Sequence, residues 1–253
     1  MKKLIVTLLV VCMVASLGMA AFAVDPTAAT GATAATEPTN PTAPTTPTTP
    51  TTPTAPTGTT EPTGATEPTF VFPFKDVEED HWGYPAVYWA AENGVTNGIS
   101  ATEFGPELGC TRAQVVTLIW RQEGCPKAKI TETPFTDLNK EEYYYDAVLW
   151  AYEAKVTKGT SDTTFSPDQV VSRGQFVTLL ARNENKDEVV TSTPFTDVDV
   201  NMYYAGPIKW AAENGITNGR TATTFEPEAN CKRVEVVMFL YRFYEAPLAP
   251  AAE

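Results

Sequence analysis

One block of about 60 residues occurs three times in the C-terminal part of this chain, and it constrains the fold more than any other feature. Each copy opens with a Phe, and from that Phe a Trp follows at offset 15, Gly at 24, Phe at 30, Pro at 32 and Arg at 38. The opening residues are Phe74, Phe135 and Phe195. A repeat of this length is one supersecondary unit used three times, and each copy buries its apolar face against its siblings.

The repeats are assigned to residues 70–126, 131–187 and 191–245, and two other segments precede them. Residues 1–23 have the basic start, apolar run and A-x-A site of a secretory signal, so we expect no membrane insertion after cleavage. Residues 24–69 are almost only Thr, Pro and Ala, which predicts a disordered, extended stalk without a core. The stalk is either a passive spacer or an O-glycosylated one.

The chain is strongly acidic, with a formal net charge of −13, and losing the two signal-peptide lysines would give −13 − 2 = −15. Proteins that bind nucleic acid or anionic membranes do so through clustered Lys and Arg, so neither partner is expected. An anionic ligand would therefore have to be held by the local geometry of a few basic side chains.

Three cysteines, Cys110, Cys125 and Cys231, follow the signal segment, and an odd number excludes a fully paired disulfide framework. Cys110 and Cys125 flank a predicted helix, which separates them too far for a mutual bridge. We expect partly buried free thiols, with a Cys110–Cys231 bridge as the alternative.

The sequence of each repeat predicts two helices. In the first repeat residues 85–92 have the apolar spacing of a helix, with Pro in the first turn and Asn-Gly at the end. The second repeat has Lys155 at that end, where a left-handed conformation would cost about 1 kcal/mol. The second helix starts at a capping box, Thr111 with Gln114, and is apolar on most sides. In the third repeat Lys232 cannot accept the box's hydrogen bond.

These patterns predict a mainly α protein. The simplest closed arrangement places the three second helices together at a pseudo-threefold axis, with the first helices outside. About 175 residues are enough for one shared core of this kind.

An Arg occupies the first turn of every second helix, where the helix dipole disfavours a cation: Arg112, Arg173 and Arg233. One interpretation is an internal ion pair with an Asp that every copy also contains: Asp76, Asp137 and Asp197. The other is an anion site, in which the guanidinium and free helix N–H groups bind a carboxylate or phosphate. A Gly in the preceding loop of each repeat either allows close approach of a ligand or serves only the turn: Gly98, Gly159 and Gly219.

The pattern Phe-x-Asp-Val, Trp-Ala, Gly-Val-x-x-Gly, Phe-x-Pro and Thr-Arg-Ala-Gln resembles the S-layer homology domain in its tandem-triplet form, over about residues 72–245. The resemblance implies a pseudo-threefold spindle around a central three-helix bundle. It also implies grooves between neighbouring repeats that bind secondary cell-wall polysaccharide linked to peptidoglycan, often through a pyruvate ketal on N-acetylmannosamine. The Arg and Gly triplets would then contact the ketal, and the Asp triplet is a further set of candidate ligand-binding residues. An aromatic residue of each repeat would offer a flat surface to the sugar: Trp82, Tyr143 and Tyr203.

The resemblance implies a secreted protein of the cell wall or S-layer that attaches non-covalently. The alternative is a structural or protein-interaction module, without glycan binding, that packs against other surface proteins. The only His, His81, supports neither a catalytic triad nor a zinc site, and the calcium-loop opening at Asp197 lacks the required Gly and Glu. No enzyme activity, cofactor or metal is expected. Departures from the family motif in repeats 2 and 3 predict that Arg112 binds best and Arg233 worst.

Overall fold

The computed structural model describes residues 70–247, so the expected signal segment and stalk lie outside the described residues. Within this range the structure has six helices and only isolated β-bridges, which confirms the mainly α fold class. None of these six helices has the length and apolar character needed to cross a membrane. Each repeat contributes two of them: α1 Tyr84–Glu92, α2 Arg112–Gln122, α3 Tyr145–Glu153, α4 Arg173–Asn183, α5 Ala205–Glu213 and α6 Arg233–Tyr244.

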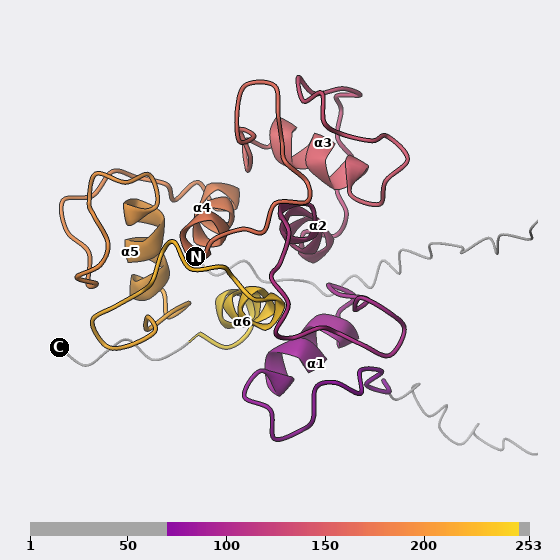
Figure 1. The fold of residues 1–253 in the computed structure, drawn as a ribbon, viewed down its shortest axis with the longest axis horizontal. Coiled ribbons are helices and arrows are strands. Elements are labelled where there is room, and N and C mark those ends of the chain that lie inside the picture. The colour runs from indigo at the N-terminus through magenta and orange to yellow at the C-terminus, as the bar shows by residue number, and fades with distance from the viewer. Residues whose placement is uncertain (1–69, 248–253) are drawn as a thin grey trace, which may run out of the picture. The chain divides into compact units, whose positions relative to one another are not determined.

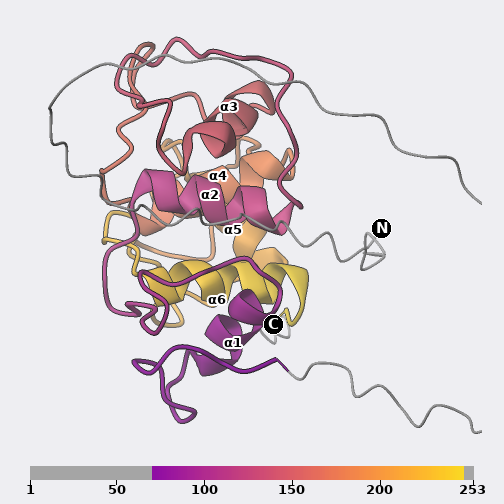
Figure 2. The ribbon, with the colours of Figure 1, turned by 90° about the vertical axis from the view of Figure 1, so that its right-hand side faces the viewer.

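The second helices of the three repeats form the centre of this region. Figure 1 looks nearly along their axes and shows α2, α4 and α6 grouped together, with α1, α3 and α5 arranged around them. In the perpendicular view of Figure 2, α3 and α1 lie on opposite sides of the central helices. The predicted pseudo-threefold arrangement is confirmed, and the apolar side chains of α2, α4 and α6 are buried in it.

Each outer helix packs against the central helix of a different repeat. The main contacts are α3 with α2, α5 with α4, and α1 with α6, so the first repeat closes the ring with the last. This exchange of helices between repeats was not predicted from the sequence. Because every contact between an outer and a central helix joins two repeats, the exchange ties the three repeats into one core.

A ring of backbone hydrogen bonds joins the repeats just before the central helices. The Cys110 N–H donates to the Cys231 carbonyl (2.9 Å), the Cys231 N–H to the Val171 carbonyl (2.9 Å), and the Val171 N–H to the Cys110 carbonyl (3.0 Å). Cys110 and Cys231 are buried free thiols, as expected, and burial raises the pKa of Cys110 to about 12. The two cysteines therefore fill the core position that Val171 holds in the second repeat, and the Cys110 thiol also hydrogen-bonds to Arg233.

The helix ends follow the sequence closely. The predicted capping box of α2 is present, because Thr111 Oγ1 accepts from the Gln114 N–H and Gln114 Oε1 accepts from the Thr111 N–H. In α6 the Lys232 N–H donates to Glu235 Oε2 (2.9 Å), while the Lys232 side chain offers no acceptor. Lys155 adopts the left-handed conformation that glycine holds in the other two repeats, with φ of 62°.

Candidate functional site

The Asp of each repeat binds the backbone of its own loop. In the first repeat Asp76 accepts from the Phe104 N–H (2.8 Å) and the Gly105 N–H (2.7 Å). The same pair of bonds recurs at Asp137 with Phe165 and Ser166, and at Asp197 with Phe225 and Glu226. A carboxylate that accepts two backbone N–H groups makes charge-assisted bonds. The Asp therefore fixes the loop that leads to the central helix.

The Arg of each repeat reaches into the next repeat. Arg112 Nε donates to the Phe165 carbonyl (2.8 Å), and its guanidinium lies 5.0 Å from the centre of the Phe165 ring. The pattern recurs for Arg173 with Phe225 and for Arg233 with Phe104. All three side chains are buried, and burial lowers the pKa of each guanidinium. Each Arg therefore has an internal role whether or not it also binds a ligand.

The Phe of each loop is thus bound by two residues, the Asp of its own repeat and the Arg of a neighbouring repeat. Phe104 donates its N–H to Asp76 and accepts from Arg233. Among the described residues no ion pair joins these arginines to these aspartates, so the interpretation as an Arg–Asp pair is wrong. The peptide of the Phe stands between the two charges.

The helix N–H groups expected to face a ligand are also engaged. The N–H groups of Arg112 and Ala113 donate to the carbonyls of Gln169 (2.9 Å) and Pro167 (3.0 Å), in the loop of the next repeat. Equivalent bonds cover the starts of α4 and α6. The expectation of free N–H groups is wrong, because the ring closure between repeats supplies carbonyls to each helix start. Any anion must be bound by side chains or by other backbone groups.

The loop glycines are required by the turn itself. Gly98 has φ of 75°, and a Cβ there would lie 2.4 Å from the Glu103 carbonyl oxygen. Gly159 and Gly219 show the same conformation and the same crowding. A side chain is excluded on both grounds. Gly219 also lines a pocket, so a turn role and a place at a ligand site are compatible.

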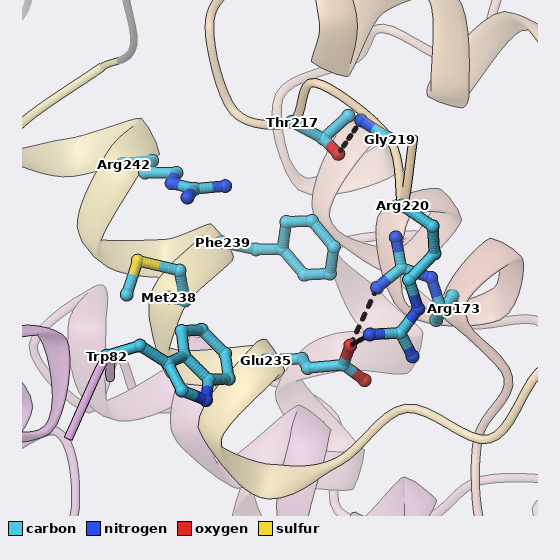
Figure 3. A pocket seen from close by; sticks show the side chains of 9 residues that line it. All are labelled: Trp82, Arg173, Thr217, Gly219, Arg220, Glu235, Met238, Phe239 and Arg242. Carbon is cyan, nitrogen blue, oxygen red and sulfur yellow. Dashed lines mark hydrogen bonds and ion pairs between the residues drawn. The ribbon is translucent and has the colours of Figure 1, made fainter. Parts of the chain in front are cut away.

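The aromatic triplet lies on the surface as predicted. Trp82, Tyr143 and Tyr203 are 55%, 56% and 50% exposed. Trp82 borders a pocket of about 270 Å³ at which the three repeats meet. Figure 3 shows its walls, with Arg173 from the second repeat and Gly219, Arg220, Glu235 and Arg242 from the third. A flat aromatic ring beside several guanidinium groups suits a ligand with an apolar face and an anionic substituent.

One carboxylate in this pocket is already paired. Glu235 Oε1 lies 3.0 Å from Arg173 Nη1 and also pairs with Arg220, which in turn reaches Glu226 at 3.3 Å. Burial lowers the pKa of Arg173, and the charge of Glu235 opposes that change. The pocket has three guanidinium groups against the one carboxylate of Glu235, so it is locally basic in an acidic protein.

The other two first-turn arginines, Arg112 and Arg233, each lie near a tyrosine of another repeat, Tyr203 and Tyr143 respectively. Partial burial raises the pKa of Tyr203, and the charges of Arg182 and Arg112 oppose the rise. Partial burial likewise raises the pKa of Tyr143, with Arg233 and Arg121 opposing. The position of Glu235 is held by Gln175 and Gln114 in the other repeats, and of the three first-turn arginines only Arg173 has a carboxylate of residues 70–247 within ion-pair distance.

Sequence reasoning missed a second Arg in every repeat. Arg242 lines the pocket of Figure 3, and its helical position is also Arg in the other two repeats. The signal was present as an Arg at offset 47 from each opening Phe: Arg121, Arg182 and Arg242. It was overlooked because an Arg near a helix C-terminus is favourable for the helix dipole and needs no further reason.

A model of the S-layer homology domain matches this chain three times, at residues 73–116, 134–177 and 194–237. The matches together cover just over half of the sequence, and each includes the Asp, the Gly and the first-turn Arg of one repeat.

Several curated proteins are similar to the same region. An S-layer protein of Bacillus thuringiensis subsp. finitimus is 28% identical over 66% of this chain and 21% of its own length. An endoglucanase of Bacillus sp. strain KSM-635 is 28% identical over 64% of this chain and 18% of its own. A cellulosome-anchoring protein of Acetivibrio thermocellus is 26% identical over 64% of this chain and 35% of its own. The chain therefore matches only a minor part of each of these relatives.

Proposed function

The chain belongs to the S-layer homology domain family, and we propose that its three repeats attach the protein non-covalently to a bacterial cell surface. The names of the relatives support attachment of this kind, since they include S-layer proteins and a cellulosome-anchoring protein. An endoglucanase shares the same stretch, so the stretch is not tied to one activity, and we propose no catalytic role for the repeats. The proposed location is the cell wall or S-layer of the organism that secretes the protein.

The proposed ligand is secondary cell-wall polysaccharide linked to peptidoglycan, recognised through an acidic substituent such as a pyruvate ketal. The observation that carries this proposal is the pocket at the junction of the three repeats. It combines an exposed indole, which can stack on a sugar ring, with guanidinium groups that can bind a carboxylate. Related combinations of Tyr and Arg lie near each other at the other two junctions.

A second candidate function is a protein-interaction module without glycan binding. It is favoured by the burial of the three first-turn arginines, which are only 3% to 5% exposed and already bound to the next repeat. In that case the arginines serve only to join repeats, and other surface proteins are the partners.

Substituting Arg112 distinguishes the two candidates. Arg112→Lys keeps the charge but loses the planar fork, so we expect the affinity for purified pyruvylated wall polysaccharide to fall about tenfold, or about 1.4 kcal/mol. Isothermal titration measures the affinity, and a thermal melt records the stability of the same sample. Lys140→Ala is the control, since it removes an exposed cation whose one ion pair within residues 70–247 is with Glu132. An unchanged affinity in Arg112→Lys would show that Arg112 does not bind the glycan, whereas no binding of the polysaccharide by the unsubstituted chain would favour the interaction module.

A further inference from the structure

The pocket beside Trp82 contains one guanidinium that internal bonds leave unused. Arg173 donates to the Phe225 carbonyl and to Glu235, and Arg220 pairs with Glu226 and Glu235. Arg242 lies on the other side of Phe239 from these two arginines in Figure 3. Within residues 70–247 no carboxylate lies within ion-pair distance of Arg242.

Arg242 is half-buried, and burial lowers the pKa of its guanidinium. A cation that is partly withdrawn from water and lacks a counter-ion binds an added anion more strongly than an exposed one does. The equivalent Arg182 differs, because its Nε lies 3.2 Å from Asp187. Arg242 is therefore available to a ligand in a way that Arg182 is not.

An acidic ligand group cannot use Arg173 as readily. Glu235 Oε1 already lies 3.0 Å from Arg173 Nη1, with both side chains about 5% exposed, so a second carboxylate there would face a like charge in a dry environment. The far wall of the pocket avoids this repulsion. The exposed ring of Trp82, which lies beside Met238 in Figure 3, lines the same pocket and offers an apolar surface on which a sugar can stack.

We propose that Arg242, rather than Arg173, binds the acidic substituent of a saccharide in the Trp82 pocket. Arg173 is then a positioning residue, which holds Phe225 and Glu235 in place. This inference rests on the proposed function, since it names the residue that recognises the anionic group of the proposed glycan.

Trp82 provides a reporter for this pocket alone, because the other two repeats have Tyr143 and Tyr203 at its position. The full chain is labelled with ¹⁵N-tryptophan, and the indole N–H signal of Trp82 is assigned as the one that disappears in Trp82→Phe. Its shift is then followed during titration with pyruvylated N-acetylmannosamine, and separately with N-acetylmannosamine that lacks the ketal.

We expect Arg242→Ala to raise the Kd for the pyruvylated sugar at this signal at least tenfold, with Arg242→Lys in between. The melting temperature should stay within a few degrees, because Arg242 has no internal ion pair to lose. The Kd for the sugar without the ketal, which binds more weakly, should change less than twofold. Arg182→Ala is the matched control and should change the Kd at Trp82 less than twofold.

A Kd at Trp82 that is unchanged in Arg242→Ala, while the unsubstituted chain binds, would overturn this inference and leave the proposed function standing. An equal loss of affinity for both sugars would also overturn it, since that result indicates a structural role. If no tryptophan signal of the unsubstituted chain moves and the chain does not bind wall polysaccharide, the proposed function fails together with the inference.

Discussion

Residues 133–186, which contain only the second repeat, are expected to remain unfolded when expressed alone. The fragment contains α3 and α4, but α3 packs against α2 of the first repeat and α4 packs against α5 of the third. Its two helices have 9 and 11 residues, and isolated helices of fewer than about 12–15 residues are marginal in water. Circular dichroism of the fragment should show little helix and no cooperative thermal transition.

The control is the whole ring of repeats, residues 70–247, which should melt in a single cooperative transition. A fragment 133–186 that is stable and unfolds cooperatively would contradict the exchange of helices between repeats.

Replacing Arg173 with Ala should destabilise the fold more than replacing either of the other two first-turn arginines. It removes the ion pair with Glu235, the bond to the Phe225 carbonyl and the contact with the Phe225 ring. Breaking a buried pair from one side costs about 3–5 kcal/mol, and we expect about 3 because Arg220 still pairs with Glu235. Urea unfolding monitored by circular dichroism measures the change in the free energy of unfolding.

The double variant Arg173→Ala with Glu235→Gln tests the cause. Gln occupies the Glu235 position in the other two repeats, so it fits the site, and it removes the buried charge that Arg173→Ala leaves with one partner fewer. The double variant should be more stable than Arg173→Ala by about 1–2 kcal/mol. Arg112→Ala, which loses no carboxylate partner, should cost less than Arg173→Ala. Equal costs for the two single variants would show that the Glu235 pair contributes nothing.

The fold was predictable to the level of single helices but not to the level of their pairing. Apolar spacing and the capping box at Thr111 placed the helices, because both are local signals that a sequence carries directly. The packing of α1 on α6 joins residues more than a hundred positions apart. Three similar copies allow both a self-contained and an exchanged pairing, so the repeat pattern alone could not decide between them.

For the candidate site, too, the sequence predicted the residues but not the arrangement in which they meet. The repeated Arg, Gly and aromatic residues were found by their spacing, but the structure combines them across repeats. Arg173 bonds to Phe225 of the next repeat, and Trp82 and Gly219 of different repeats line one pocket. A departure in one repeat therefore alters the surroundings of an Arg in another. Glu235 of the third repeat faces Arg173 of the second, whereas Arg233 lies near Tyr143. The expected order of binding, with Arg233 last, rested on the departures from the family motif in repeats 2 and 3, and it stays a prediction.

The central claim is that the repeats hold the protein to the wall through an acidic sugar substituent. Residues 70–247 are mixed with Gram-positive cell walls that carry pyruvylated secondary polysaccharide, and with the same walls after mild acid has removed the ketal, and both mixtures are sedimented. We predict that the protein pellets with the native walls and stays in the supernatant with the stripped walls. Equal sedimentation with both walls, or none with the native walls, would contradict the account.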